Sequence, residues 1–282
     1  MGEARASLSA GCALGALLSA LAWCPPARAE TADADFQKAV SALNQGAYGE
    51  AVDRLELLAD QGFVHPDASF DRAVAYLGRA RSPQRKDGDL GRAVHAFSET
   101  LLLRPDDRGA EAALTAVRSE IARRHSRAGG GPLVARPRLA RAIATLLPEV
   151  VWGAAALAGA LALAVGIALR FIVRKPSYEV AASLAMGVGA LVLVVGGVLC
   201  RAAFYFETQT TPAVVVAPAA RLLDAIGRPL PVRQGSDGSA IPEGSDVYVL
   251  GRQGGLVHVE WGNEEAWVVA NQVRELARAP AR

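Results

Sequence analysis

Two long uninterrupted apolar runs dominate the pattern of hydrophobic and polar positions along the chain. Val150–Leu169 has twenty residues and Val180–Cys200 has twenty-one, and neither contains an ionisable acid or base other than the final cysteine. At 1.5 Å rise per residue, each run forms a helix of about 30 Å, the thickness of the hydrocarbon core of a bilayer. We therefore expect a transmembrane helical hairpin over residues 149–201, with Arg170–Glu179 as its connector. The alternative, two buried helices of a large soluble domain, is disfavoured because neither run has a polar face.

Small residues recur four positions apart within both runs. The pairs are Ala155/Gly159, Ala162/Gly166, Ser183/Gly187 and Ala185/Gly189. Because small side chains let helix backbones approach one another in lipid, this spacing predicts close packing between the two helices.

Residues 30–125 show a helical period and contain two similar units. Each unit predicts a helix with small residues on one face, a glycine turn, and a second helix with alanine at its first buried position. The positions that carry this pattern are Ala39, Gly46, Tyr48, Ala51, Leu77, Gly78, Ala93, Phe97 and Pro105. The pattern resembles the tetratricopeptide (TPR) repeat, which implies an α-helical solenoid. The interval from Gly78 to Ala93 is longer than in that family.

A capping helix is expected over Ala110–Arg123, because a stack of two repeats would otherwise leave an apolar face bare. The groove of a TPR solenoid usually holds a peptide or a partner helix. Arg72, Arg79 and Arg81 are candidates to line that groove. For each of them, a solvated helix face is the alternative interpretation.

The first residues have the pattern of a secretory signal peptide, residues 1–29. The apolar stretch Ala6–Trp23 precedes two prolines, and Ala27-Arg28-Ala29 has the small-x-small form of a cleavage site. We expect cleavage after Ala29. Lipidation at Cys24 and an uncleaved anchor are the alternatives.

Residues 126–148 are expected to join the helical region to the membrane. The first part, 126–138, is rich in glycine and proline and predicts a linker. Leu139–Leu147 predicts a short interfacial helix, with Arg136, Arg138 and Arg141 near the lipid headgroups.

The pattern changes to short β-type runs in residues 208–277. The predicted strands are Ala213–Val216, Arg221–Leu223, Asp246–Leu250, Leu256–Trp261 and Ala266–Val269. Short strands separated by glycine-rich turns predict a small barrel, and their order resembles a bacterial SH3-like domain.

Three aromatic residues of this region, Tyr248, Trp261 and Trp267, could form a ligand face. We expect Trp267 to pack in the core instead, because so small a domain needs large side chains inside. Trp261 is expected to be the more open of the two tryptophans.

Charge and residue chemistry narrow the function. The chain has 30 Lys and Arg against 28 Asp and Glu, and the arginines that flank the hairpin account for the positive excess. Neither soluble part has the basic face that nucleic acid binding requires. The three cysteines, Cys12, Cys24 and Cys200, lie in or beside apolar runs, and the four histidines are scattered. No catalytic, metal-ligand or cofactor motif occurs, so we expect a non-enzymatic protein without a cofactor.

The order of these segments resembles the TPR membrane proteins of bacterial aerotolerance (Bat-type) operons. The resemblance rests on the pattern over Phe36–Ala51, on Gly88–Ala93, and on the hairpin followed by an SH3-like domain. It implies an envelope scaffold that works with von Willebrand A-domain membrane proteins and a MoxR-type ATPase.

The sequence thus predicts a membrane protein of α + β class in the inner membrane of a bacterium. The signal peptide implies that the TPR-like domain is exported, and a two-helix hairpin returns the C-terminal domain to the same, periplasmic side. The first functional hypothesis is a scaffold whose TPR-like domain binds envelope proteins. The alternative is a cell-wall sensor or anchor whose SH3-like domain binds peptidoglycan peptides.

Overall fold

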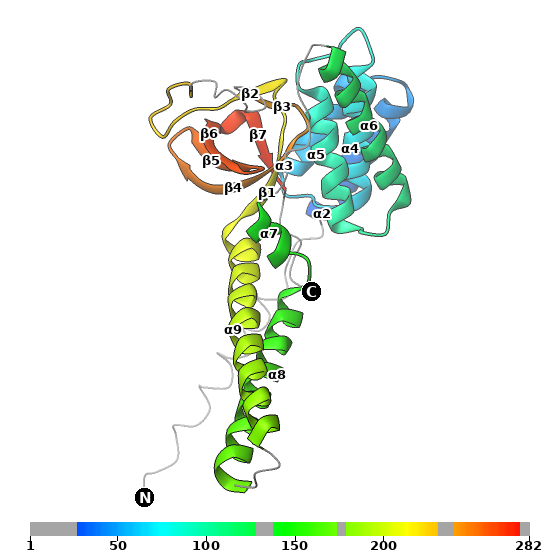
Figure 1. The fold of residues 1–282 in the computed structure, drawn as a ribbon. Coiled ribbons are helices and arrows are strands. Elements are labelled where there is room, and N and C mark those ends of the chain that lie inside the picture. Colours follow the sequence, from blue (N-terminus) through cyan, green and yellow to red (C-terminus); the bar gives the residue numbers. More distant parts are fainter. Residues whose placement is uncertain (1–26, 128–137, 174–178, 231–239, 277–282) are drawn as a thin grey trace, which may run out of the picture.

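The computed structural model describes residues 27–127, 138–173, 179–230 and 240–276. A helical domain and a β-domain lie side by side at one end of a long helical hairpin (Figure 1). The helical domain consists of α2 (Ala27–Asn44), α3 (Tyr48–Asp60), α4 (Pro66–Ala80), α5 (Asp89–Leu103) and α6 (Arg108–Arg127). The predicted signal peptide lies outside the described residues except for Ala27–Ala29, which begin α2.

The helical domain packs around small buried residues, as the sequence pattern predicts. Ala39, Ala51, Ala73 and Ala93 are fully buried, which lets neighbouring helices approach closely, and Phe97 is the largest fully buried side chain. The two predicted units correspond to the pairs α2–α3 and α4–α5. The predicted capping helix is α6, which is longer at both ends than expected and turns Leu114, Val117 and Ile121 toward the core.

The turn before α5 is longer than the repeat pattern requires, and the structure shows how it closes. The carboxylate of Asp89 accepts a hydrogen bond from the backbone N–H of Lys86 at 2.8 Å. Gly88 adopts the left-handed conformation, with φ of 82°. Glycine suits this position because other residues adopt positive φ only at a cost.

Two apolar helices form the hairpin, and both are long enough to span a membrane. These are α8 (Glu149–Ala168), which continues through a π-helical turn, η1 (Leu169–Val173), and α9 (Glu179–Gln209). Two expected boundaries are wrong. The first helix continues into the predicted connector, and the second continues past Cys200 until Gln209.

Small residues line the contact between α8 and α9, but at a different spacing from the one expected. Gly159 and Gly166 on α8 and Gly189 and Gly196 on α9 are buried. They recur every seven residues, and a Cβ atom at Gly159 would lie 2.5 Å from the backbone nitrogen of Leu193. The predicted pair Ser183/Gly187 is therefore wrong as a packing pair, since both residues are exposed and a Cβ at Gly187 would meet nothing within 4 Å.

A short helix, α7 (Leu139–Ala144), precedes the hairpin and packs against α9. Its position corrects one expectation. The side chain of Arg141 is not available to bind lipid headgroups, because it is only 4% exposed and donates a hydrogen bond to Glu260 at 2.5 Å. Arg138 likewise pairs with Glu265 at 2.7 Å, and Arg136 lies outside the described residues.

The β-domain contains a five-stranded and a two-stranded sheet. The strands are β1 (Thr211–Val215), β2 (Ala219–Arg221), β3 (Ala240–Pro242), β4 (Asp246–Gln253), β5 (Leu256–Trp261), β6 (Glu264–Val269) and β7 (Val273–Glu275). The larger sheet has the order β6-β5-β4-β1-β7, with antiparallel neighbours, and β2 pairs with β3.

Strand β1 links the three parts of the molecule. Only Thr210 separates it from the end of α9. Its side chains alternate between two cores, as a strand's period of two requires. Val214 belongs to the core of the helical domain, whereas Ala213 and Val215 belong to the core of the β-domain.

Candidate functional site

The arginines predicted to line a groove do not act together. Arg72 and Arg79 are buried, with 5% and 4% exposure, and are held in ion pairs inside the helical domain. Arg72 pairs with Glu99, and Arg79 pairs with Asp89 at 2.6 Å. The groove assignment is therefore wrong for these two residues, because neither can reach a ligand. Arg81 is exposed and pairs with Glu120 of α6 at 2.8 Å.

One side of α4 instead carries three apolar side chains that pack against the core and remain partly exposed. Phe70, Val74 and Leu77 are half-buried and recur at helical spacing, so they share one side of the helix. Arg81 follows at the end of the same face. This surface, which we call the α4 face, combines apolar contact area with the exposed guanidinium of Arg81, which is paired with Glu120.

The residues predicted as a repeat signature fill structural positions. A Cβ atom at Gly78 would lie 2.4 Å from the ring of Tyr48, so this glycine lets α4 pack on α3. Gly46 has φ of 73° and Pro105 is exposed in the turn before α6. Leu77 packs partly against the core.

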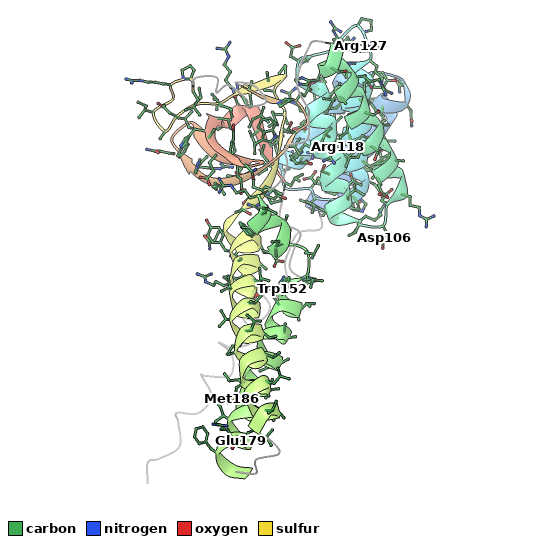
Figure 2. All side chains as sticks on the ribbon, in the orientation of Figure 1. Asp106, Arg118, Arg127, Trp152, Glu179 and Met186 are labelled. Carbon is green, nitrogen blue, oxygen red and sulfur yellow. The ribbon has the colours of Figure 1, made fainter. Side chains whose placement is uncertain are left out.

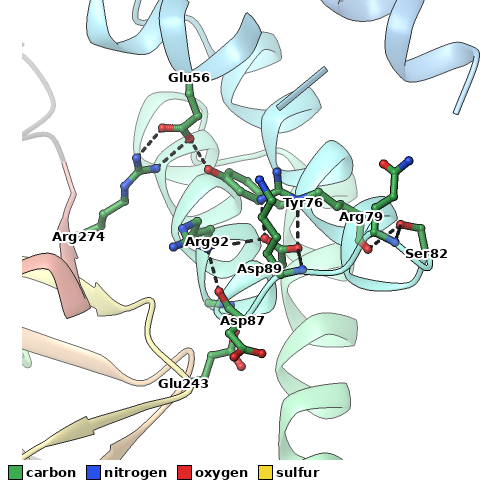
Figure 3. Close-up of polar contacts among 12 residues, drawn as sticks. Glu56, Tyr76, Arg79, Ser82, Asp87, Asp89, Arg92, Glu243 and Arg274 are labelled. Carbon is green, nitrogen blue, oxygen red and sulfur yellow. Dashed lines mark hydrogen bonds and ion pairs between the residues drawn. The ribbon is translucent and has the colours of Figure 1, made fainter. Parts of the chain in front are cut away.

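A polar cluster joins the helical domain to the β-domain (Figure 3). Arg274 of β7 donates two hydrogen bonds to the carboxylate of Glu56 on α3, at 2.8 and 2.5 Å. The hydroxyl of Tyr76 on α4 donates to the same carboxylate at 2.9 Å. A bidentate Arg–carboxylate pair also fixes the relative orientation of its two partners.

Backbone contacts at two glycines extend this interface. The N–H of Gly91 on α5 donates to the carboxylate of Glu243 at 2.7 Å. A Cβ atom at Gly91 would lie 2.7 Å from the carbonyl oxygen of Val215, and one at Gly88 would lie 2.1 Å from that of Val216. The absence of a side chain at both positions therefore lets β1 approach α5 closely.

Two further contacts join the helical domain to the β-domain. The Nε2–H of buried His95 donates to the carbonyl oxygen of Glu275 at 3.0 Å. Arg118 of α6 donates to both carboxylate oxygens of Asp246, each at 2.8 Å. Contacts from α3, α5 and α6 thus hold one side of the β-domain, which we call the interdomain interface.

Several ionisable groups of the interdomain interface have shifted pKa values. Burial by itself would raise the pKa of the Glu56 carboxyl, but Arg274 and Arg72 outweigh it and lower that pKa from 4.5 to about 2. The pKa of Arg274 is raised by its hydrogen bond to Glu56. Burial raises the pKa of Glu243 and lowers the pKa of His95. Glu56 and Arg274 are therefore ionised together at neutral pH.

The predicted aromatic face of the β-domain is arranged differently from expectation. Trp261 is 6% exposed and belongs to the core, whereas Trp267 is half-exposed and stacks on His258 with ring centroids 4.8 Å apart. The expected fates of the two tryptophans are thus reversed. Tyr248 is covered by the guanidinium of Arg141, which lies 3.7 Å from its ring centroid.

Most of the interdomain interface was missed by sequence reasoning. Glu56, Glu243 and Arg274 belong to no motif. Gly88 and Gly91 were noted only as part of a repeat pattern. A glycine inside a helix costs about 1 kcal/mol relative to alanine, so Gly91 in the first turn of α5 was a usable signal of close packing.

Within the described residues, no group of three or more His, Cys, Asp or Glu side chains could hold a metal ion. Comparison of the chain with protein-family models, with curated proteins and with solved structures finds no match.

Proposed function

We propose that this protein is a non-enzymatic, membrane-anchored assembly scaffold. In this proposal the hairpin spans the inner membrane of a bacterium, and the helical domain and β-domain are TPR-like and SH3-like modules on the periplasmic side. The observation that carries it is the interdomain interface. Half-buried ion pairs such as Glu56–Arg274 hold both modules as one unit at one end of the hairpin.

A scaffold needs a surface for its partner, and the α4 face has suitable chemistry. Phe70, Val74 and Leu77 offer apolar area on a rigid helix, and Arg81 offers a cation beside it. Such a surface suits an apolar segment of a partner. The resemblance to Bat-type proteins suggests a von Willebrand A-domain membrane protein as the partner and a MoxR-type ATPase in the same system.

Affinity purification from solubilised membranes tests this proposal. The full chain should recover envelope proteins, and Val74→Glu should reduce their recovery at least about tenfold, because a buried unpaired charge costs 1.4 kcal/mol or more of binding. Leu57→Glu is a matched control, since Leu57 is 54% exposed and lies on a different helix, α3.

Circular dichroism of both variants shows whether the helices remain folded. Equal recovery with Val74→Glu and with the unchanged chain would exclude the α4 face. If no envelope protein is recovered at all, the scaffold proposal itself fails.

A cell-wall sensor or anchor is the second candidate function. Its support is the half-exposed Trp267–His258 pair on β6 and β5, with Glu265 3.5 Å from His258. This group could stack on a peptidoglycan peptide and pair with its charges. Sedimentation of the detergent-solubilised full chain with purified sacculi, and its loss in Trp267→Ala, would favour this candidate; a scaffold need not co-sediment.

A further inference from the structure

Helix α7 and the turn after it carry an apolar surface with no cover among the described residues. Leu139, Ile143 and Leu146 are 79%, 47% and 74% exposed. They recur every three or four residues, so they lie on one side. The opposite side is buried, with Arg141 at 4% exposure and Ala144 at 0%. Water is a poor environment for so many large apolar side chains on so short a segment.

This surface continues into the first candidate membrane span. Val150 and Val151, at the start of α8, are 80% and 43% exposed. The indole N–H of Trp152 donates to the carbonyl oxygen of Ala144 at 3.1 Å, which ties α8 to α7. Figure 2 shows Trp152 at the end of the hairpin nearest the helical domain and the β-domain, and Glu179 at the opposite end. Tryptophan is enriched where a span meets the membrane–water interface.

The single buried arginine of α7 is committed to the β-domain. Arg141 lies between the rings of Phe206 and Tyr248, with its Cζ 4.4 and 3.7 Å from their centroids, and pairs with buried Glu260. Its guanidinium therefore cannot extend to a phosphate. The affinity of α7 for lipid would come from its apolar side chains alone.

We infer that α7 lies in the headgroup–acyl boundary of the membrane, with Leu139, Ile143 and Leu146 in lipid and Arg141 as a latch to the β-domain. The ligand of this surface is the lipid bilayer. The β-domain is thereby held at the membrane surface on one defined side. This inference rests on the proposed membrane placement of the hairpin and adds a second contact with the bilayer.

Environment-sensitive fluorophores on single cysteines test it in the full chain. The three native cysteines are replaced by alanine, and one cysteine is introduced in Ile143→Cys, Leu146→Cys, Leu161→Cys or Arg127→Cys. Leu161 is 61% exposed within the span, and Figure 2 shows Arg127 at the end of the helical domain farthest from the hairpin. The labelled proteins are reconstituted in vesicles of phosphatidylethanolamine and phosphatidylglycerol. Quenching is measured with aqueous iodide and with nitroxide-labelled lipids.

We expect lipid nitroxide near the headgroup to quench the labels at positions 143 and 146, with loss of the iodide quenching seen at position 127. If position 161 is quenched by deep lipid nitroxide while 143 and 146 remain open to iodide, the inference fails and the hairpin anchor stands. Protection of 143 and 146 from both quenchers would indicate a protein cover and would also overturn it. Iodide quenching at position 161 would overturn the membrane placement, and the inference with it.

Discussion

His95 is the residue whose ionisation bears most directly on the interdomain interface. Burial lowers its pKa, and nearby Arg72 and Arg274 act in the same direction. Glu99 and the carbonyl oxygen of Glu275 oppose them without reversing the shift. The neutral imidazole is therefore the form that fits the folded protein.

The sign of the resulting pH dependence follows from this shift. Below the ordinary histidine pKa of 6.5, the unfolded chain binds a proton that folded His95 does not bind until lower pH. The free energy of unfolding should therefore fall as pH decreases from about 7 to about 5.5. Urea unfolding of the detergent-solubilised chain at both pH values should show a smaller decrease for His95→Gln.

Comparison of the unchanged chain with His95→Gln isolates the contribution of His95 to the pH dependence. Glu56, with a pKa of about 2, stays ionised across the window. The raised pKa values of Glu243 and Asp246 act in the opposite direction, but they are common to both proteins. Equal decreases would show that the histidine does not control the effect.

Single residues also show where sequence reasoning succeeds and where it fails. The buried alanines Ala39, Ala51 and Ala93 were predicted because their spacing repeats. The Glu56–Arg274 pair could not be predicted, because 218 positions separate its members and no local pattern links them. The burial of Trp261, by contrast, follows from a local pattern. Trp261 follows Val257 and Val259 at a period of two, and so shares their buried face.

At the scale of helices and strands, the chemical pattern predicts the type of element better than its ends. Apolar run length predicted both hairpin helices, because length and uniform hydropathy are local properties. It predicts the end of the second helix at Cys200, although Phe204–Glu207, three aromatic residues and a glutamate, continue the helix. Strands β3 and β7 were missed because three residues are too few to show a period.

The α8–α9 contact gives a prediction at this scale. Gly159→Ala places a Cβ atom 2.5 Å from the backbone nitrogen of Leu193, which cannot move without separating the helices. We expect a loss of about 1–3 kcal/mol in hairpin stability, the usual cost of overpacking. The midpoint of thermal unfolding in detergent measures it.

Gly187→Ala is the matched control, because a Cβ atom there meets nothing within 4 Å. It should unfold at or slightly above the midpoint of the unchanged chain, since alanine favours the helix. If both variants lower the midpoint equally, the glycine contact between α8 and α9 does not stabilise the hairpin.

At the scale of the whole molecule, the interdomain interface couples the helical domain to the β-domain. Val214 packs in the helical core while its neighbours Ala213 and Val215 pack in the β-domain, so the core of the helical domain includes a side chain of strand β1. The sequence could not show this union. It predicted two separate modules, because each has its own period and composition.

Gly91→Ala tests this union. The added Cβ atom would lie 2.7 Å from the carbonyl oxygen of Val215 and 2.9 Å from the Cα of Val216. We expect a loss of about 1–3 kcal/mol and faster amide hydrogen exchange in β1 and α5 together.

Gly49→Ala provides its control on α3, where the new Cβ atom would make only an ordinary 3.5 Å contact with Gln84. It should leave exchange in β1 unchanged and stabilise the protein by about 0.5–1 kcal/mol. Unaltered exchange in Gly91→Ala would mean that the two domains are not coupled at this glycine.

The passage from α9 to β1 through Thr210 alone has a mechanical consequence. The hydroxyl of Thr210 donates to the carbonyl oxygen of Phe206, so even this joint is braced. A hairpin in a thinner bilayer reduces hydrophobic mismatch by tilting. Because only one residue joins α9 to β1, that tilt would reorient the helical domain and the β-domain together with the hairpin. The thickness of the bilayer would then set the direction in which the α4 face points.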